Sequence, residues 1–476
     1  MKLFSQAVSG ARWTTLSAGV TTITELLRTL ILARLLSPLD FGLMAMVMIV
    51  IGLAQTYADL GVSAAIIWRQ DSTQEHLSSL YWLNVITGIL IFAVLWMCTP
   101  FIALLFREPH LVPLLHVIAL VFLIIPWGAQ FEILLQKELS FALLARQEII
   151  SSATGLIVAV MAAFAGLGVW ALIYSFIATM LVKTLLLMRI GYVKYRPLLH
   201  FRVSDIRGYA GFGLFQLGER SVNYISERLD QILIGPLLGA TALGYYNFAF
   251  NLTARPVSRI NPMLTRVAFP VFSKVQDDGP RLQKGYLTLV SFLTTINAPL
   301  LVGLAASAPV AVPLIFGNKW SPAVVLIQIL SFASLSRSIG NPIGSLQLAK
   351  GRADLGFWWN LLLLIASAPT VYVGAHYGPI GVAIGLLLLQ IALQIPSYLY
   401  LIRPLIGGCA RGYTSVTLIP TCAACLMGFA VLTVPSLSMG RGVTLAIQIV
   451  LGAGLYILLV RTFHKESVSG FRVFSS

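Results

Sequence analysis

The chain has 476 residues, of which 58% are hydrophobic and only 10% are charged, and its formal net charge is +15. Soluble domains carry about 25% charged residues, so this composition excludes an ordinary soluble protein. It indicates an integral membrane protein.

Fourteen apolar segments are long enough to span a bilayer, which takes about 20 helical residues. The runs are continuous and do not alternate, so we expect an all-α membrane protein and not a β-barrel. The predicted spans are 13–36, 41–67, 78–105, 111–135, 146–165, 168–189, 208–235, 241–272, 286–316, 322–347, 354–375, 379–402, 412–434 and 441–462.

The connections between these spans alternate in positive charge. One set carries 20 Lys and Arg, whereas the other carries only Arg107, Lys319 and Arg441. Because positively charged loops stay in the cytoplasm, both termini are predicted to be cytoplasmic. The most basic connection, 189–207, is predicted to touch anionic lipid headgroups. The loops thus account for most of the net charge, and nucleic acid is a poor partner.

The first half of the chain resembles the second at an offset of 202 residues. Residues 23–44 and 225–246 share Glu25/Glu227 and Gly42/Gly244, and weaker matches continue to the sixth span of each half. Transporters are commonly built from such repeats around a polar cavity. We predict two parallel six-helix lobes around a central cationic cavity, with two further helices. The N-terminal lobe is predicted to cover 1–195, a basic linker 196–207 and the C-terminal lobe 208–405. The two further helices and a cytoplasmic tail take 406–476.

Ionisable residues lie inside several predicted spans, where each costs about 2.5–3.5 kcal/mol if it faces lipid. The basic ones are Arg28, Arg34, Lys183, Arg220, Arg228, Arg255, Arg259, Arg266 and Arg337. The acids that we count are Glu25, Asp59, Glu132, Glu219, Glu227 and Asp230. Those away from the helix ends are predicted to face protein or water.

Their spacing places many of them on shared helical faces. These faces are Arg220, Asn223, Glu227 and Asp230; Asn247, Asn251, Arg255 and Arg259; Ser17, Thr21, Thr24 and Arg28; Gln55, Asp59 and Ser63; and Ser331, Ser334, Ser338, Asn341 and Ser345 beside Arg337. Pro256 is predicted to break its helix. We expect the five faces to line one aqueous cavity.

The surplus of arginine over acids favours an anionic ligand, and guanidinium matches phosphate well. The predicted substrate-binding residues are Arg28, Arg220, Asn223, Asn247, Asn251, Arg255, Arg259, Arg337 and Asn341. Six others either couple ions or form structural ion pairs, and both interpretations stay open: Glu25, Asp59, Glu219, Glu227, Arg228 and Asp230. No catalytic residue, metal site or cofactor is predicted, apart from a possible coupling proton or sodium ion.

Four segments carry a resemblance to a known group: ARLLSPLDFGLMA (33–45), ADLGVSAAIIWR (58–69), ALGYYNFAFNL (242–252) and FPVFS (269–273). The chain resembles the polysaccharide repeat-unit flippases of the bacterial multidrug/oligosaccharidyl-lipid/polysaccharide exporter superfamily, and among these the exporters of colanic-acid-like glycans.

The resemblance implies transport without enzymatic activity. The substrate would be an undecaprenyl-pyrophosphate-linked oligosaccharide, moved across the cytoplasmic (inner) membrane by alternating access for exopolysaccharide, capsule or lipopolysaccharide synthesis. A monomer suffices, with membrane lipids and possibly a polymerase or export machinery as partners. Three alternatives remain. An organic-cation exporter is disfavoured by the excess of arginine, and a membrane glycan polymerase or ligase is disfavoured by the short external loops. A scaffold would not need buried charges.

Overall fold

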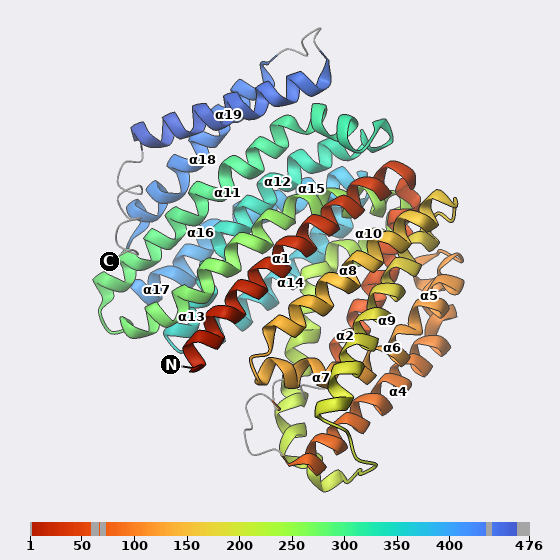
Figure 1. Cartoon of the computed structure of the whole chain (residues 1–476). Coiled ribbons are helices and arrows are strands. Elements are labelled where there is room, and N and C mark those ends of the chain that lie inside the picture. Colours follow the sequence, from red (N-terminus) through yellow and green to blue (C-terminus); the bar gives the residue numbers. More distant parts are fainter. Residues whose placement is uncertain (1, 59–65, 67–72, 435–439, 464–476) are drawn as a thin grey trace. The chain divides into compact units, whose positions relative to one another are not determined.

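The computed structural model describes residues 2–58, 66, 73–434 and 440–463, and every regular element in this part of the chain is a helix (Figure 1). The prediction of an all-α membrane protein is therefore confirmed. The chain forms two compact units, Met1–Gly244 and Tyr245–Ser476. The lobes predicted from the repeat divide the chain earlier, at 196–207, and they remain a prediction about which parts move.

The first unit contains the helices up to the middle of α10, and α1 packs along α8, which packs along α9. Their bounds are α1 Lys2–Leu35, α2 Pro38–Ala58, α4 Gln74–Phe106, α5 Leu111–Ala119, α6 Val121–Ile124, α7 Pro126–Lys137, α8 Phe141–Phe164, α9 Val169–Lys194 and α10 Val203–Lys274.

The second unit is organised around α11, which packs against α12, α18 and α19. The bounds are α11 Gly279–Ile315, η1 Asn318–Trp320, α12 Ala323–Gly340, α13 Pro342–Ala349, α14 Ala353–Ala375, α15 Gly378–Ala392, α16 Gln394–Ser397, the π-helical η2 Tyr398–Ile402, α17 Arg403–Ile406, α18 Ala410–Leu432 and α19 Arg441–Phe463.

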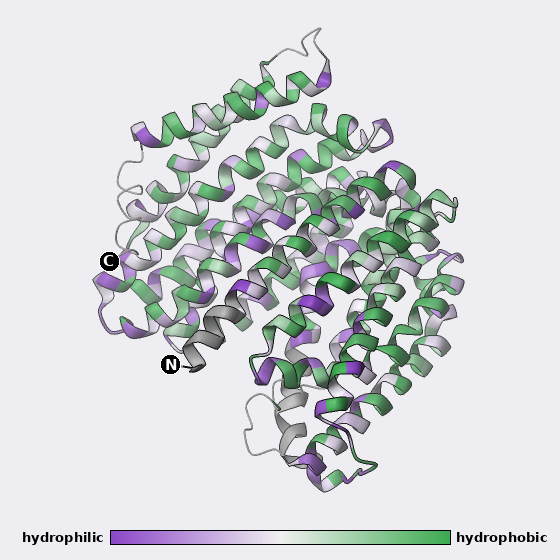
Figure 2. Ribbon diagram, in the orientation of Figure 1, coloured by the Kyte–Doolittle hydropathy of each residue, from purple (hydrophilic) through white to green (hydrophobic). Residues whose placement is uncertain are grey.

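Twelve helices of the described residues are long and apolar enough to cross a membrane, or thirteen if a bent pair counts as one span. That pair, Leu111–Ile124 and Pro126–Lys137, bends by 48° where the sequence predicted one continuous helix. Figure 2 shows hydrophobic residues along the length of α4 and α19. The chain is thus a multi-pass membrane protein, and the expected number of fourteen spans stays a prediction.

The long helix α10 consists of two arms that meet at Gly239. Gly239 has φ 84° and ψ 172°, which is not helical and which glycine adopts at little cost. We call residues 203–238 the first arm and 240–274 the second arm. The predicted break at Pro256 is wrong, because the helix continues through this residue. A proline lacks only one amide hydrogen, and the preceding turn tolerates that loss here.

The predicted linker 196–207 is shorter than expected. Helix α9 continues to Lys194 and α10 already begins at Val203, so only residues 195–202 are non-helical. Apolar residues such as Val193 and Val203 extend the two helices into the basic segment.

The start of α2 and the start of the second arm cross with their backbones in contact. A Cβ on Gly42 would lie 1.7 Å from the carbonyl oxygen of Ala240, and a Cβ on Gly244 would lie 2.0 Å from that of Pro38. The sequence repeat aligns Pro38 with Ala240 and Gly42 with Gly244. The contact is therefore reciprocal between the two aligned segments. Small residues allow this close approach in a membrane, where helices associate by packing.

We expect Gly42→Ala to lower the free energy of unfolding by about 1–3 kcal/mol, because the new methyl group overpacks a backbone contact. The matched control is Gly19→Ala in α1, where a Cβ would meet nothing within 4 Å. Because alanine favours a helix over glycine, the control should be as stable as the original chain or up to about 1 kcal/mol more stable. Thermal unfolding in detergent, followed by tryptophan fluorescence, measures both. A Gly42→Ala protein as stable as the control would contradict the crossing.

Candidate functional site

A polar pocket lies between α2 and the first arm of α10. Its volume is about 460 Å³. Four predicted residues of the first arm line it together: Arg220, Asn223, Glu227 and Arg228. The other lining residues are Met48, Gly52, Gln55, Thr56 and Tyr224. The shared helical face inferred from the spacing of Arg220, Asn223 and Glu227 thus becomes one wall of a pocket.

Tyr224 connects the two walls of this pocket. Its hydroxyl donates hydrogen bonds to the carbonyl oxygens of Met48, at 3.3 Å, and Ile49, at 2.9 Å. A Cβ on Gly52 would lie 2.3 Å from that hydroxyl, so glycine makes room for the ring. A second contact joins the same helices, from Ser221 Oγ to the hydroxyl of Tyr57 at 3.0 Å. Neutral hydrogen bonds therefore hold the first arm on α2.

Arg228 is oriented by an aromatic ring. Its guanidinium carbon lies 5.5 Å from the centroid of the Tyr224 ring, and one of its nitrogens donates to Gln231 Oε1 at 3.4 Å. A cation over an aromatic face is stabilised by the ring quadrupole. With Arg220, Arg228 and one acid, Glu227, the pocket lining carries a net charge of +1. It is suited to an anion.

Other predicted residues of the first unit lie elsewhere. Asp230 is buried, with only 5% of its surface exposed, and its Oδ1 accepts from the amide of Gln231 at 2.8 Å. Asp230 therefore does not share the pocket with Arg220, because its side chain turns back onto the helix backbone. Glu25 and Arg28 lie half-buried on α1 and do not line the pocket. Asp59 and the side chain of Glu219 lie outside the described residues.

The second unit presents a separate polar group on the second arm of α10. Asn251 Nδ2 donates to both the carbonyl oxygen and Oδ1 of Asn247, each at 2.8 Å. Arg255 is half-buried and Arg259 is exposed further along the arm. The sequence of the second arm contains Arg255, Arg259 and Arg266 and no acid. The single central cavity expected to unite it with the Arg220 pocket stays a prediction.

Arg337 of α12 is positioned by two neighbouring helices. Its guanidinium carbon lies 5.7 Å from the centroid of the Phe250 ring. The amide of Gln390 in α15, oriented to satisfy its neighbours, accepts from Arg337 Nε and donates to the carbonyl oxygen of Ala333, both at 2.7 Å. The Arg337 side chain is nevertheless exposed, as is Asn341 one turn later. A held but exposed guanidinium can bind a ligand with little loss of side-chain entropy.

The serines beside Arg337 do not face a cavity as predicted. Ser331, Ser334, Ser338 and Ser345 are buried. Asn297 Nδ2 donates to Ser338 Oγ at 2.7 Å and to Asn261 Oδ1 at 3.0 Å, so this polar group joins α10, α11 and α12. The helical period correctly aligned the serines, but small hydroxyl residues pack equally well between membrane helices.

Two further polar contacts were missed or read differently from the sequence. Glu148 lies within a predicted span but was not counted, and its Oε2 accepts from the buried Ser17 of α1 at 2.5 Å. The predicted polar face of α1 is thus partly used against α8. Glu132 and Lys183, both among the ionisable residues of the predicted spans, form an ion pair at 2.9 Å. The presence of an acid in one span and a polar residue or cation in another could have signalled both contacts.

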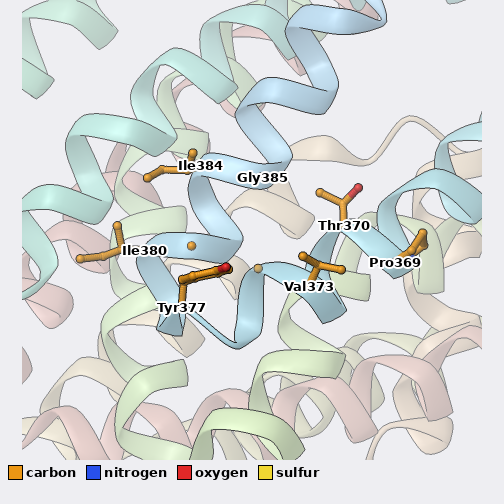
Figure 3. Close-up of a pocket in the computed structure, with 9 residues that line it drawn as sticks. Pro369, Thr370, Val373, Tyr377, Ile380, Ile384 and Gly385 are labelled. Atoms are coloured by element: carbon orange, nitrogen blue, oxygen red, sulfur yellow. The ribbon is translucent and has the colours of Figure 1, made fainter.

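A larger hollow of about 680 Å³ lies at the hairpin of α14 and α15, where Gly374 and Gly381 let the two backbones meet (Figure 3). It is lined by Pro369, Thr370, Val373, Gly374, Tyr377, Ile380, Gly381, Ile384 and Gly385. None of these residues is charged, so the hollow offers no cationic side chain to an anion. The candidate site is therefore the Arg220 pocket, with Arg337 and the second arm as a second cationic group.

Known proteins resemble this chain over most of its length. Residues 31–325 match the family described as "Polysaccharide biosynthesis protein". The chain is 35% identical to the lipopolysaccharide biosynthesis protein WzxC of Escherichia coli K12, over 87% of this chain and 84% of the relative. It is also 35% identical to the teichuronic acid biosynthesis protein TuaB of Bacillus subtilis 168, over 78% of this chain and 77% of the relative.

The fold is also found among solved structures. The inward closed conformation of the lipid II flippase MurJ superposes with a TM-score of 0.77 at 15% identity, covering 95% of this chain and 99% of MurJ. At this identity the likeness shows the shared fold alone. Together with the sequence matches, it confirms the family resemblance: this chain belongs to the polysaccharide biosynthesis protein family.

Proposed function

We propose that this protein is a flippase that moves lipid-linked oligosaccharide repeat units across the cytoplasmic membrane. The observation that carries the proposal is the net positive pocket of Arg220, Arg228 and Glu227 within a membrane-embedded bundle. The polysaccharide-related names of WzxC and TuaB support a glycan substrate, and the name of MurJ, a lipid II flippase, supports a lipid-linked one.

The chemistry of such a substrate explains why arginines are placed inside the bilayer. An oligosaccharide joined to a polyprenyl pyrophosphate carries a hydrated, anionic head that cannot cross hydrocarbon unaided. Guanidinium groups bind phosphate oxygens through paired hydrogen bonds. Arg220 and Arg228 would bind the pyrophosphate while the lipid tail stays in the membrane. Arg255, Arg259 and Arg337 of the second unit remain further predicted phosphate ligands.

The cycle is proposed to use alternating access, with the net free energy supplied by the membrane potential or an ion gradient. Moving negative charge outward across an inside-negative membrane releases about 2.3 kcal/mol per charge per 100 mV. Glu227, in the same pocket as two arginines, is the candidate to carry a proton or sodium ion in return. The protein would act without catalysing bond changes, as a monomer with cytoplasmic termini, alongside a polysaccharide polymerase or export machinery.

We expect Arg220→Gln and Arg228→Gln each to weaken substrate binding about tenfold to a hundredfold, because a hydrogen bond to a charged group contributes about 1.5–3 kcal/mol. Arg220→Lys should lose less, since the charge remains. The measurement is the distribution of lipid-linked repeat units between leaflets in a deletion strain that expresses each variant. Completed units should accumulate on the cytoplasmic side.

The control is Arg281→Gln, an exposed arginine that pairs with Asp278 outside the pocket. It should restore export fully. Completed units that accumulate in the outer leaflet of the deletion strain would instead favour a polymerase or ligase. Unchanged lipid-linked glycans with new sensitivity to organic cations would favour a drug exporter. Either result would overturn the proposal.

Gln390→Leu should weaken substrate binding about twofold to tenfold, because it removes the acceptor that positions Arg337 while leaving the charge in place. The matched control is Gln394→Leu one turn away, which removes a 2.7 Å hydrogen bond to Ser336 Oγ and no contact with Arg337. Substrate affinity in proteoliposomes measures both. If Gln390 acts through Arg337, its effect should vanish in an Arg337→Gln background. An equal effect in both backgrounds would refute this role.

A further inference from the structure

The basic connection between α9 and α10 is tied onto the first turns of α4. We call residues 195–205 the strap. Gln74 Nε2 donates to the carbonyl oxygen of Arg196 at 3.1 Å, and Trp82 Nε1 donates to that of Leu198 at 2.9 Å. Ser78 Oγ accepts from the amide of Leu198 at 2.9 Å. Gln74, Ser78 and Trp82 are spaced four apart, so one face of α4 holds the strap backbone.

A second set of contacts fixes the C-terminal end of the strap to α4. Ser79 Oγ accepts from the amide of Arg202 at 3.1 Å and donates to Asp205 Oδ2 at 2.7 Å. His200 Nε2 lies 3.0 Å from the same carboxylate oxygen. The hydrogen bond from Ser79 holds the pKa of Asp205 below its usual range. The strap is therefore an ordered element, although its residues 195–202 are not helical.

The length of α4 places the strap at the level of lipid headgroups. The helix has 33 residues, which at 1.5 Å each is about 50 Å, whereas the hydrocarbon core is about 30 Å thick. The part of α4 from Leu83 to Phe106 contains no charged residue and is long enough to cross that core. Residues 74–82 then project beyond the hydrocarbon. The rings of Trp82 and Trp127 meet edge to face, with their centroids 6.4 Å apart. Such a pair fits the aromatic belt of a membrane interface.

The strap directs apolar and basic side chains outward together. Leu199 is 95% exposed and Val203 is 66% exposed, and Phe201 is also exposed. Arg196 and Arg202 are exposed between them. Two acids near the strap are already engaged, since Asp205 contacts Ser79 and His200, and Glu138 pairs with Lys194. Alternating apolar and cationic side chains at headgroup depth match a lipid surface that is apolar below and anionic above.

We propose that the strap is a docking surface for anionic phospholipids, with Leu199 and Val203 inserted at the interface and Arg196 and Arg202 on the lipid phosphates. The depth along α4 and the neighbouring tryptophans favour a bilayer over an acidic protein, which would not require apolar side chains at this level. The function of the strap is to attach the junction of the two sequence repeats to one leaflet. This inference does not depend on the transported substrate.

The test uses the full chain with its four cysteines replaced and Leu199→Cys carrying a bimane fluorophore, reconstituted in phosphatidylcholine vesicles. Equal fractions of brominated phosphatidylglycerol or brominated phosphatidylcholine are then added as quenchers. We expect stronger quenching by the anionic lipid, since each arginine enriches it locally by about fivefold. Arg196→Gln with Arg202→Gln should abolish the preference, and Arg281→Gln should preserve it.

A second measurement does not depend on the cysteine replacements. Native mass spectrometry of the unlabelled chain from mixed lipids should retain fewer anionic lipids on the Arg196→Gln, Arg202→Gln protein than on the Arg281→Gln protein. Equal quenching by both brominated lipids, or equal lipid retention by both variants, would overturn the proposal. Quenching by neither lipid would place Leu199 in water and leave the surface to a protein partner, which also overturns it.

Discussion

An arginine inside a lipid bilayer needs other groups to hold it, and this requirement organises both units of the protein. Arg228 lies over the ring of Tyr224, and Arg337 lies over the ring of Phe250 with its Nε bonded to Gln390. Aromatic faces and neutral amides stabilise a guanidinium without neutralising it. The charge therefore stays available to an anion. An acid in place of the ring or amide would have formed an ion pair with the arginine, and the arginine would then bind an anion less well.

The lipid bilayer also determines how the helices pack. Lipid provides no hydrophobic force between apolar helices, so close backbone contact and small polar residues hold them together. The crossing of Gly42 with Gly244 and the buried group of Asn261, Asn297 and Ser338 are both of this kind. Neutral hydrogen bonds from Tyr224 fasten the first arm of α10 to α2. Glycine and neutral groups thus make these structural contacts, beside charged ones such as the ion pair of Glu132 and Lys183.

Helical periodicity correctly placed three predicted residues on one face of a helix. Arg220, Asn223 and Glu227 share a face in a regular helix, and they line one pocket. The same reasoning was less successful for Asp230, which lies ten residues after Arg220 but is buried against its own backbone. Spacing gives the direction of a side chain and not its neighbours. It also could not identify Tyr224 or Gln390, since an aromatic ring or an amide in a membrane helix has many possible contacts.

The sequence by itself determined the class of the protein. Its apolar runs are too long and too numerous for a soluble fold, its basic connections alternate with connections that carry few Lys and Arg, and residues 23–44 resemble 225–246. These properties follow from the cost of placing charge and unpaired backbone in lipid, which acts on each segment separately. Only the tertiary structure decided which polar faces bind and which pack, because that depends on the neighbouring helix. Serines beside Arg337 became packing residues, while Arg337 itself stayed exposed. The break at Gly239 and the strap on α4 likewise depend on contacts between distant residues.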